Sequence, residues 1–249
     1  MPKSLRLLPF MFVSILALML LANLVHAAPK NFQAQLDRAG VAYQVPEVGK
    51  AILVNIPSFE LIAFNDGIPV LRSRVIVGAP WHRTPRQHTH VSTVRFRPTW
   101  RPTASMIASG KYTDRVRPPG ENNPLGLAAV RLEPGSLVYL HDTNRRDLFA
   151  KEYRALSHGC VRVQQWDALV AFVLDMDIDL VTQLANGRRT FDAPAPPIPV
   201  ELGYFTRFPD PTGQIITHPD LYGLHPASAA PEQDSANAQV ACGGPTISD

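Results

Sequence analysis

The residues best suited to chemistry are a cysteine and a histidine that lie 19 positions apart. Cys160 lies in the run Ser157–Val163, and His141 ends an apolar run upstream. An imidazole can take the proton of a thiol, and the thiolate can then attack a carbonyl carbon. The pair therefore predicts nucleophilic acyl transfer at a site that the rest of the chain must assemble.

Two short strands would bring further groups to the same cleft. Side chains alternate faces along a strand, so Tyr139 and His141 share one face of the expected strand Leu137–His141. By the same rule Cys160 and Arg162 share a face, while the valines beside them point to the core. A thiol, an imidazole, a phenol and a guanidinium would then line one pocket.

The backbone beside the cysteine is a candidate oxyanion hole. Gly159 allows a tight turn and close approach to a substrate, and its amide and that of Cys160 could bind an oxyanion with help from the Tyr139 hydroxyl. Plainer interpretations remain open. Cys160 and Tyr139 could be core residues, His158 could hold the turn, and Arg162 could pair with an acid.

Length and composition limit the fold and the partners. The 249 residues allow one sizeable domain or two small ones. The 24 prolines disfavour a mostly helical protein. The formal charge is only +3, without a basic stripe interleaved with aromatics, so nucleic acid is a poor partner candidate.

Residues 1–27 are typical of a secretory signal peptide. Lys3 and Arg6 precede the apolar run Leu7–Ala22, and small residues allow cleavage before Ala28. The run falls short of the ~20 residues of a spanning helix, although an uncleaved membrane anchor is the alternative. We expect export to the periplasm, and no other stretch is apolar enough to span a membrane.

The chain has two cysteines, Cys160 and Cys242. In an oxidising compartment a disulfide between them is one interpretation. However, Cys242 lies in the small, polar segment 226–249, which we expect to be disordered. We therefore expect Cys160, not Cys242, to be the reactive thiol.

The remaining pattern predicts a mainly β fold with short helices (α+β). After a lead-in over 28–49, Asp66-Gly67 between apolar runs predicts a hairpin. An apolar face at helical spacing predicts a helix over Trp166–Leu174, and the Pro-rich stretch 100–123 predicts a loop over the cleft. Strands are expected at 51–56, 61–64, 70–77, 90–97, 127–132 and 137–141, with a final pair at 200–208 and 213–222.

His141, fifteen intervening residues and Ser157–Arg162 together resemble the L,D-transpeptidase catalytic domain, also called YkuD. The resemblance covers about Lys50–Gly223 and implies a β-sandwich catalytic domain over 50–225. Other stretches are similar to the larger YcbB-type members: Ile52–Pro57, Val75–Gly78, Arg83–Pro85, Pro98–Trp100, Asn123–Gly126, Tyr139–Thr143 and Pro219–Gly223.

The resemblance implies roles for particular residues. Cys160 would be the nucleophile and His141 the base, with the backbone carbonyl of Asp142 orienting the imidazole ring. His158 and Ser157 would line the site near the oxyanion hole. The family needs no metal or cofactor.

The implied substrate is the peptidoglycan stem tetrapeptide. Cys160 would attack the carbonyl of its third residue, a diamino acid, and release D-alanine. An amine of another stem would resolve the thioester and form a 3→3 crosslink. Carbapenems typically acylate this cysteine in the family.

Other functions remain open. Water could resolve the same thioester, giving a carboxypeptidase or a hydrolase that releases wall proteins. A non-catalytic wall-binding module would leave Cys160 structural. A zinc peptidase lacks an H-E-x-x-H motif, although several imidazoles are present: His82, His88, His90, His141 and His158.

Four cations in the loop over the cleft bear on the choice of acceptor. Arg101, Lys111, Arg115 and Arg117 could hold the carboxylates of a second stem peptide. A bound stem would displace water and favour aminolysis over hydrolysis. The alternative is that these side chains form a solvated face of the loop.

Overall fold

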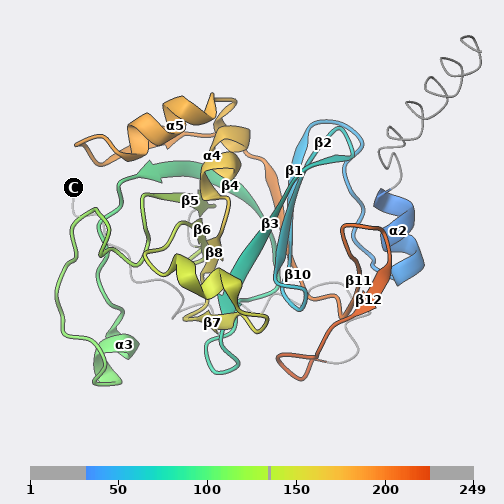
Figure 1. Ribbon diagram of the computed structural model, residues 1–249, viewed down its shortest axis with the longest axis horizontal. Helices are drawn as coiled ribbons and strands as arrows, with labels where there is room; N and C mark the ends of the chain where they lie inside the picture. The colour runs from blue at the N-terminus through green and yellow to red at the C-terminus, as the bar shows by residue number, and fades with distance from the viewer. Residues whose placement is uncertain (1–31, 134–135, 225–249) are drawn as a thin grey trace, which may run out of the picture. The chain divides into compact units, whose positions relative to one another are not determined.

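The computed structural model describes residues 32–133 and 136–224 (Figure 1). The expected signal peptide, the expected tail and Cys242 lie outside these residues. Within the two described ranges, no helix has the length and apolarity needed to cross a bilayer.

Strands dominate the described residues, and the helices between them are short (Figure 1). The predicted fold class is therefore confirmed. The strands are β1 Lys50–Asn55, β2 Glu60–Asn65, β3 Ile68–Gly78, β4 Gln87–Phe96, β5 Ala128–Leu132, β6 Tyr139–His141, β7 Ala155–Ser157, β8 Val161–Val163, β9 Phe191–Pro194, β10 Pro199–Gly203, β11 Arg207–Pro209 and β12 Ile215–Thr217. The helices are α2 Phe32–Ala39, α3 Ala104–Ala108, α4 Trp166–Leu174, α5 Ile178–Ala185 and the 3₁₀ helix η2 Arg146–Ala150.

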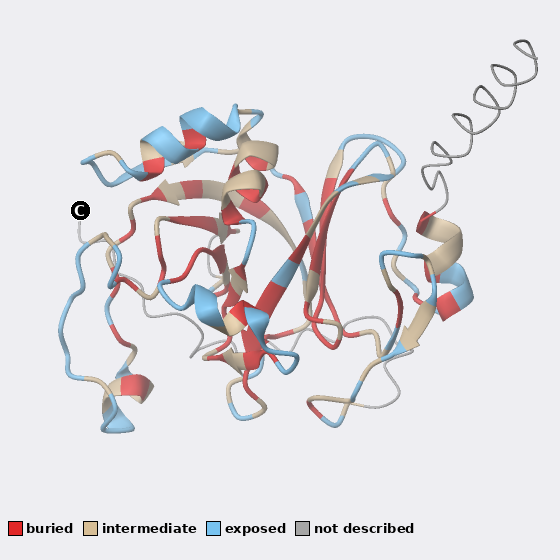
Figure 2. Ribbon diagram, in the orientation of Figure 1, coloured by how far each residue is buried: buried red, intermediate tan, exposed pale blue. Residues whose placement is uncertain are grey.

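One ten-stranded sheet wraps round the core. Its strand order is β10-β1-β2-β3-β8-β6-β5-β4-β9, with β7 paired to β3. Strand β10 pairs in parallel with β1 and antiparallel with β4, so the first strand of the path closes on the strand next to its last. Closure removes the unpaired edges between these strands, and the buried residues lie along them in Figure 2.

The hairpin between β2 and β3 forms where the sequence predicts it. Asp66 and Gly67 have φ angles of 49° and 75°, and Asn65 pairs with Ile68. Two successive residues with positive φ give a turn whose twist matches that of the strands. Glycine carries no steric penalty at such an angle.

The N-terminal helix covers a second, smaller core. Phe32 and Leu36 of α2 pack with Phe64 of β2 and Phe208 of β11. The ring of Phe32 lies 5.3 Å from that of Phe64 and 6.2 Å from that of Phe208. The expected lead-in over 28–49 therefore includes a docked helix.

The predicted final pair of strands forms in part. The expected strand 200–208 is divided in two: β10 joins the closed sheet, whereas β11 pairs with β12 as predicted, with Phe208 opposite Ile216. The short helices α3 and α5 and the strand β9 are also absent from the prediction. Pairing between distant strands depends on tertiary packing, which local patterns do not encode.

Strands β6 and β8 lie side by side and position the candidate site. They pair in parallel, with Leu140 opposite Val161 and His141 opposite Arg162. The side chains of Leu140, Val161 and Val163 are buried in the main core, as the alternation predicts. The opposite faces of both strands are therefore free to line a pocket.

Candidate active site

The expected reactive groups line one small cavity of about 50 Å³. Cys160 comes from the turn between β7 and β8, His141 from β6 and Arg162 from β8. Ser157 and His158 also line it, as expected. The other walls come mainly from the segment over the cleft: Trp100, Met106, Tyr112, Pro124 and Leu125.

Cys160 is 4% exposed, and backbone groups of the neighbouring strand surround its sulfur. The amide of Tyr139 donates to Sγ at 3.2 Å, and the carbonyl oxygen of Leu137 lies 3.6 Å from Sγ. An amide donor of this kind stabilises a thiolate. The sulfur is disulfide-bonded in the structure, and its partner lies outside the described residues. A disulfide-bonded sulfur carries no thiol, so nucleophilic attack by Cys160 would require the reduced protein.

The backbone defines the tautomer of His141. Its Nδ1 makes a short hydrogen bond with the carbonyl oxygen of Asp142. Because a carbonyl can only accept, Nδ1 carries the proton and Nε2 keeps its lone pair. The geometry agrees with the role that the family resemblance implies for Asp142.

Burial keeps the His141 ring neutral. Burial, together with the positive charge of Arg162, lowers the pKa of His141 to about 3, while the carbonyls of Asp142 and Leu125 act in the opposite direction. A neutral ring can accept a proton. In the reduced protein a thiolate beside the ring would favour the protonated form, since opposite charges stabilise each other.

The turn before Cys160 is held by internal hydrogen bonds. The Ser157 hydroxyl donates to the carbonyl of Cys160 at 2.6 Å and accepts from the amide of Gly159 at 3.0 Å. Gly159 has a φ of 113°, which favours glycine. Since its amide is already used by Ser157, the Cys160 amide is the better candidate for binding an oxyanion.

Tyr139 lies beside the pocket rather than in it. Its side chain packs on the cluster of Trp100, Met106 and Leu125, and the guanidinium of Arg131 lies 5.9 Å from its ring centre. The phenol is absent from the lining of the small cavity. The structure therefore favours a role for the Tyr139 amide, at the sulfur, over one for its hydroxyl.

His158 belongs to a stack of rings at the mouth of the pocket. Its ring lies 4.5 Å from that of His82 at an interplanar angle of 28°, and Tyr112 meets it edge-on at 6.1 Å. Burial, with the charges of His82, Arg162 and Lys111 nearby, lowers the pKa of His158 to about 4. A neutral imidazole at this position can donate or accept a hydrogen bond to a ligand.

Arg162 presents a cation to the pocket. Across residues 32–133 and 136–224, no carboxylate lies within ion-pair distance of its guanidinium, so the alternative of an acid partner is not what the structure shows. Burial lowers its pKa, but a guanidinium stays protonated in proteins. A half-buried cation of this kind fits an anionic group on a ligand.

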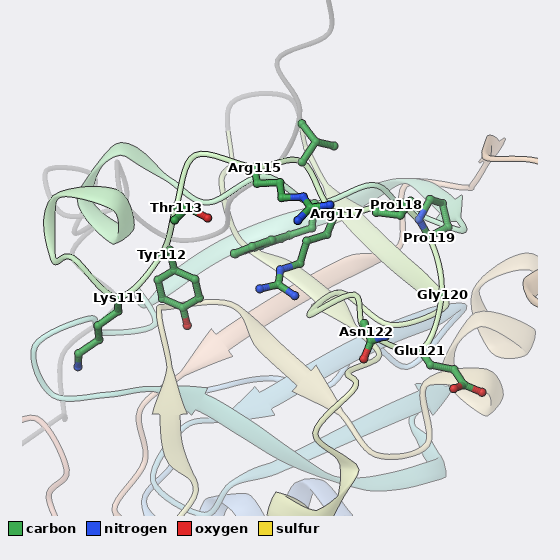
Figure 3. Close-up of a pocket in the computed structure, with 12 residues that line it drawn as sticks. Lys111, Tyr112, Thr113, Arg115, Arg117, Pro118, Pro119, Gly120, Glu121 and Asn122 are labelled. Carbon is green, nitrogen blue, oxygen red and sulfur yellow. The ribbon is translucent and has the colours of Figure 1, made fainter.

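A larger cavity of about 610 Å³ lies within the segment over the cleft and shares Trp100 and Tyr112 with the small cavity (Figure 3). In Figure 3, Lys111 and Glu121 lie toward its two ends, with Arg115 and Arg117 between them. The guanidinium of Arg117 lies over the Trp100 ring at 5.8 Å.

Arg101 differs from the other three cations. Its guanidinium forms two hydrogen bonds of 2.7 Å with Asp114, and it is absent from the cavity lining. Lys111, Arg115 and Arg117 do line the cavity. The predicted set of four therefore reduces to three for contact with a ligand.

The histidines of the zinc alternative have other partners. His88 pairs with Glu201 and His90 with Glu133, while His141 bonds the backbone of Asp142. In the part of the chain that the structure describes, no three His, Cys, Asp or Glu side chains are grouped to hold a metal ion. The donor geometry therefore does not support a zinc centre there.

Thr84 and Tyr222 have roles at the site that the sequence pattern did not predict. The Thr84 hydroxyl donates to the carbonyl of Gly159 at 2.7 Å and accepts from the amide of Gly78 at 2.9 Å. The Tyr222 hydroxyl donates to the carbonyl of Gly78 and accepts from the amide of Thr84. Both residues lie in stretches that resemble the YcbB-type members, which was the available signal.

Comparison with known proteins gives the family of the chain. A model of the L,D-transpeptidase catalytic domain, YkuD, matches residues 49–182, more than half of the chain. The chain belongs to the L,D-transpeptidase catalytic domain family. This confirms the resemblance inferred from the motif.

Two curated relatives have similar sequences. A putative L,D-transpeptidase of Haemophilus influenzae is 30% identical over 222 residues, which cover 72% of this chain and 45% of that protein. The probable L,D-transpeptidase YbiS of Escherichia coli K12 is 30% identical over 61% of this chain and 52% of that protein. The chain thus spans about half the length of these curated relatives.

A solved structure of the LD transpeptidase LdtMt1 in complex with imipenem also matches. It is 16% identical, and the match covers 62% of this chain and 59% of that chain with a TM-score of 0.41.

Proposed function

We propose that this family member is a peptidoglycan L,D-transpeptidase with Cys160 as its nucleophile. It transfers the acyl group of a stem tetrapeptide to an amine acceptor, releases D-alanine and forms a 3→3 crosslink. The observation that carries the proposal is the convergence of Cys160, His141 and Arg162 on one cavity.

In the proposed first half-reaction, Nε2 of His141 takes the thiol proton of reduced Cys160. The thiolate attacks the carbonyl carbon of the third stem residue, and the Cys160 amide stabilises the oxyanion. The C–N bond then breaks, and D-alanine leaves as an amine with the proton from His141. Arg162 would hold a carboxylate of the donor stem by charge-assisted hydrogen bonds.

In the second half-reaction, the amine of another stem attacks the thioester. His141 removes a proton from this amine, and the thiolate leaves. Lys111 and Arg115 extend the cationic wall of the larger cavity, which would hold the carboxylates of the acceptor stem. Occupation of this cavity would keep water away from the thioester and favour aminolysis over hydrolysis.

The test is incubation of the reduced protein with purified disaccharide-tetrapeptide, followed by mass analysis of the products. The expected products are a crosslinked dimer and free D-alanine. Cys160→Ala should abolish both, while Cys242→Ala should leave both intact. A parallel incubation without reductant should show less product, since the disulfide removes the nucleophile.

The acceptor is tested by the ratio of dimer to tripeptide monomer. Lys111→Gln combined with Arg115→Gln should lower this ratio. Arg101→Gln is the matched control and should not change it, because Asp114 already binds Arg101. If the wild-type protein forms only tripeptide, even at high acceptor concentration, the transpeptidase proposal is wrong. The alternative function, an L,D-carboxypeptidase, would then hold.

Two further expectations accompany this proposal. Carbapenems should acylate reduced Cys160 and increase the protein mass by that of the drug. Residues 1–27 should direct export, which would place the enzyme in the periplasm beside its peptidoglycan substrate.

A further inference from the structure

Next to His141, an arginine without a role in the proposed chemistry forms hydrogen bonds with a buried carboxylate. Arg146 donates from Nε to Oδ1 of Asp142 at 3.1 Å and from a terminal nitrogen to Oδ2 at 2.8 Å. The Asp142 side chain is 1% exposed, whereas that of Arg146 is 58% exposed. An exposed cation thus reaches inward to a carboxylate directly after the proposed base.

The other side of this carboxylate is held by the chain before β5. The amide of Leu127 donates to Oδ2 of Asp142 at 2.9 Å. Gly126 lies so close that a Cβ built there would be 2.3 Å from Oδ2 and 2.5 Å from Cβ of Asp142. Gly126 also has a φ of +64°. Only glycine fits both the angle and the contact.

The main chain of Asp142 is restrained as well. Its amide donates to the carbonyl of Ala128 at 3.0 Å. Its own carbonyl accepts the hydrogen bond from Nδ1 of His141. The side chain and both peptide groups of Asp142 are therefore anchored, so the direction of its carbonyl follows from these contacts.

We propose that Arg146 is a positioning residue that orients His141 through Asp142. The two hydrogen bonds from Arg146 to the Asp142 carboxylate fix the Asp142 peptide. The carbonyl of this peptide then fixes the tautomer and the direction of the imidazole ring. This inference rests on the proposed role of His141 as the base. It adds Arg146, the Asp142 carboxylate and Gly126 to the residues on which that role depends.

A salt bridge that served only stability would have a different signature. Exposed ion pairs contribute little to stability, and their loss does not move a distant ring. Loss of Arg146 instead frees one side of a buried carboxylate, which can then rotate with its peptide. The hydrogen bond at Nδ1 of His141 would lengthen, and the ring would sample the wrong tautomer.

The chain supplies a matched control in the preceding residue. Arg145 forms a bidentate pair with Asp147, with both distances at 2.9 Å, and both side chains are more than half exposed. Arg145→Gln removes the same charge one position away without touching Asp142. Arg146→Gln removes the charged pair of hydrogen bonds to Asp142. Arg146→Lys retains the charge but can contact the carboxylate at only one point.

The experiment is ¹⁵N and ¹H NMR of the histidine rings in the reduced full-length protein, with the His141 signals assigned from a His141→Gln variant. In wild type, Nδ1–H should give a slowly exchanging, downfield proton. Arg146→Gln should move or broaden this signal, Arg146→Lys should restore it in part, and Arg145→Gln should leave it unchanged. Circular dichroism confirms that each variant is folded.

Kinetics provide the second readout. With disaccharide-tetrapeptide, Arg146→Gln should lower kcat about tenfold or more with little change in KM. The proposal is overturned if the Nδ1–H signal and kcat of Arg146→Gln equal those of Arg145→Gln. A wild-type protein without transpeptidase activity would refute the proposed function. The NMR signal does not depend on turnover, so it would still test whether Arg146 orients His141.

Discussion

The Thr84 hydroxyl ties the turn that carries Cys160 to the end of strand β3, and its removal is a sharp test of the site. Thr84 is 1% exposed. The change Thr84→Val keeps the shape of the side chain and replaces the hydroxyl with a methyl group. The carbonyl of Gly159 then loses its donor, and the amide of Gly78 loses its acceptor.

The expected cost comes from these two buried groups. A buried backbone group left without a partner costs about 1–3 kcal/mol, so the loss of two such bonds in Thr84→Val should lower the free energy of unfolding by about 2–6 kcal/mol. Water has little room to replace the hydroxyl, because a Cβ at Gly78 would lie 2.1 Å from the carbonyl oxygen of His82. Thr84→Ser keeps both bonds and should cost only about 1 kcal/mol for the lost methyl group.

The assay is urea unfolding under reducing conditions, combined with the rate of dimer formation. Thr84→Val should also lower kcat, because Gly159 and the oxyanion donor after it lose a fixed position. A Val variant as stable and active as the Ser variant would refute the reasoning. So would equal losses in both, since the methyl group would then matter rather than the hydroxyl.

Two other predictions concern pH and export. Burial raises the pKa of Glu201 to about 7, above its usual value of 4.5. The folded state therefore binds this proton more tightly, so the contribution of Glu201 to stability should be fully present below about pH 4.5 and be lost as the pH rises through 7, a slope that Glu201→Gln should reduce. A variant with the same slope as wild type would assign the pH dependence to another group. N-terminal sequencing of the exported protein should begin near Ala28, whereas a membrane-bound chain that still begins at Met1 would instead identify an anchor.

Local sequence patterns determined several parts of this protein. Asp66-Gly67 predicted the hairpin because two positive φ angles match the twist of its strands. Alternation predicted which faces of β6 and β8 enter the core, since side chains have a strict period of two along a strand. The helical spacing after Val163 predicted α4 with the residues that form it.

The sequence also identified the family and predicted the reactive pair. Cys160 and His141 have a chemistry of their own, and the spacing of the motif is specific. The family match over 49–182 confirmed the family, and the catalytic roles of the two residues stay a prediction. The placement of both residues on one cavity agrees with the chemistry that their side chains suggest.

Only the tertiary structure decided what each group near the thiol is bound to. Ser157 uses the amide of Gly159, Asp114 binds Arg101, and Arg162 faces the pocket. Several acceptors compete for each donor. Which one binds depends on distances between atoms in the folded chain, and the spacing of residues along the sequence does not encode these distances.

The closure of the sheet is likewise a tertiary property. Strand β10 lies between β1 and β4, although nearly 150 residues separate Ile52 from Val200, its partner in the ladder. The hydrogen bond from Thr84 to Gly159 also joins residues that lie far apart in the sequence, 75 positions along the chain. Long-range pairs of this kind form because burial and backbone hydrogen bonding are satisfied together in the folded state, and a local pattern contains only one side of each pair.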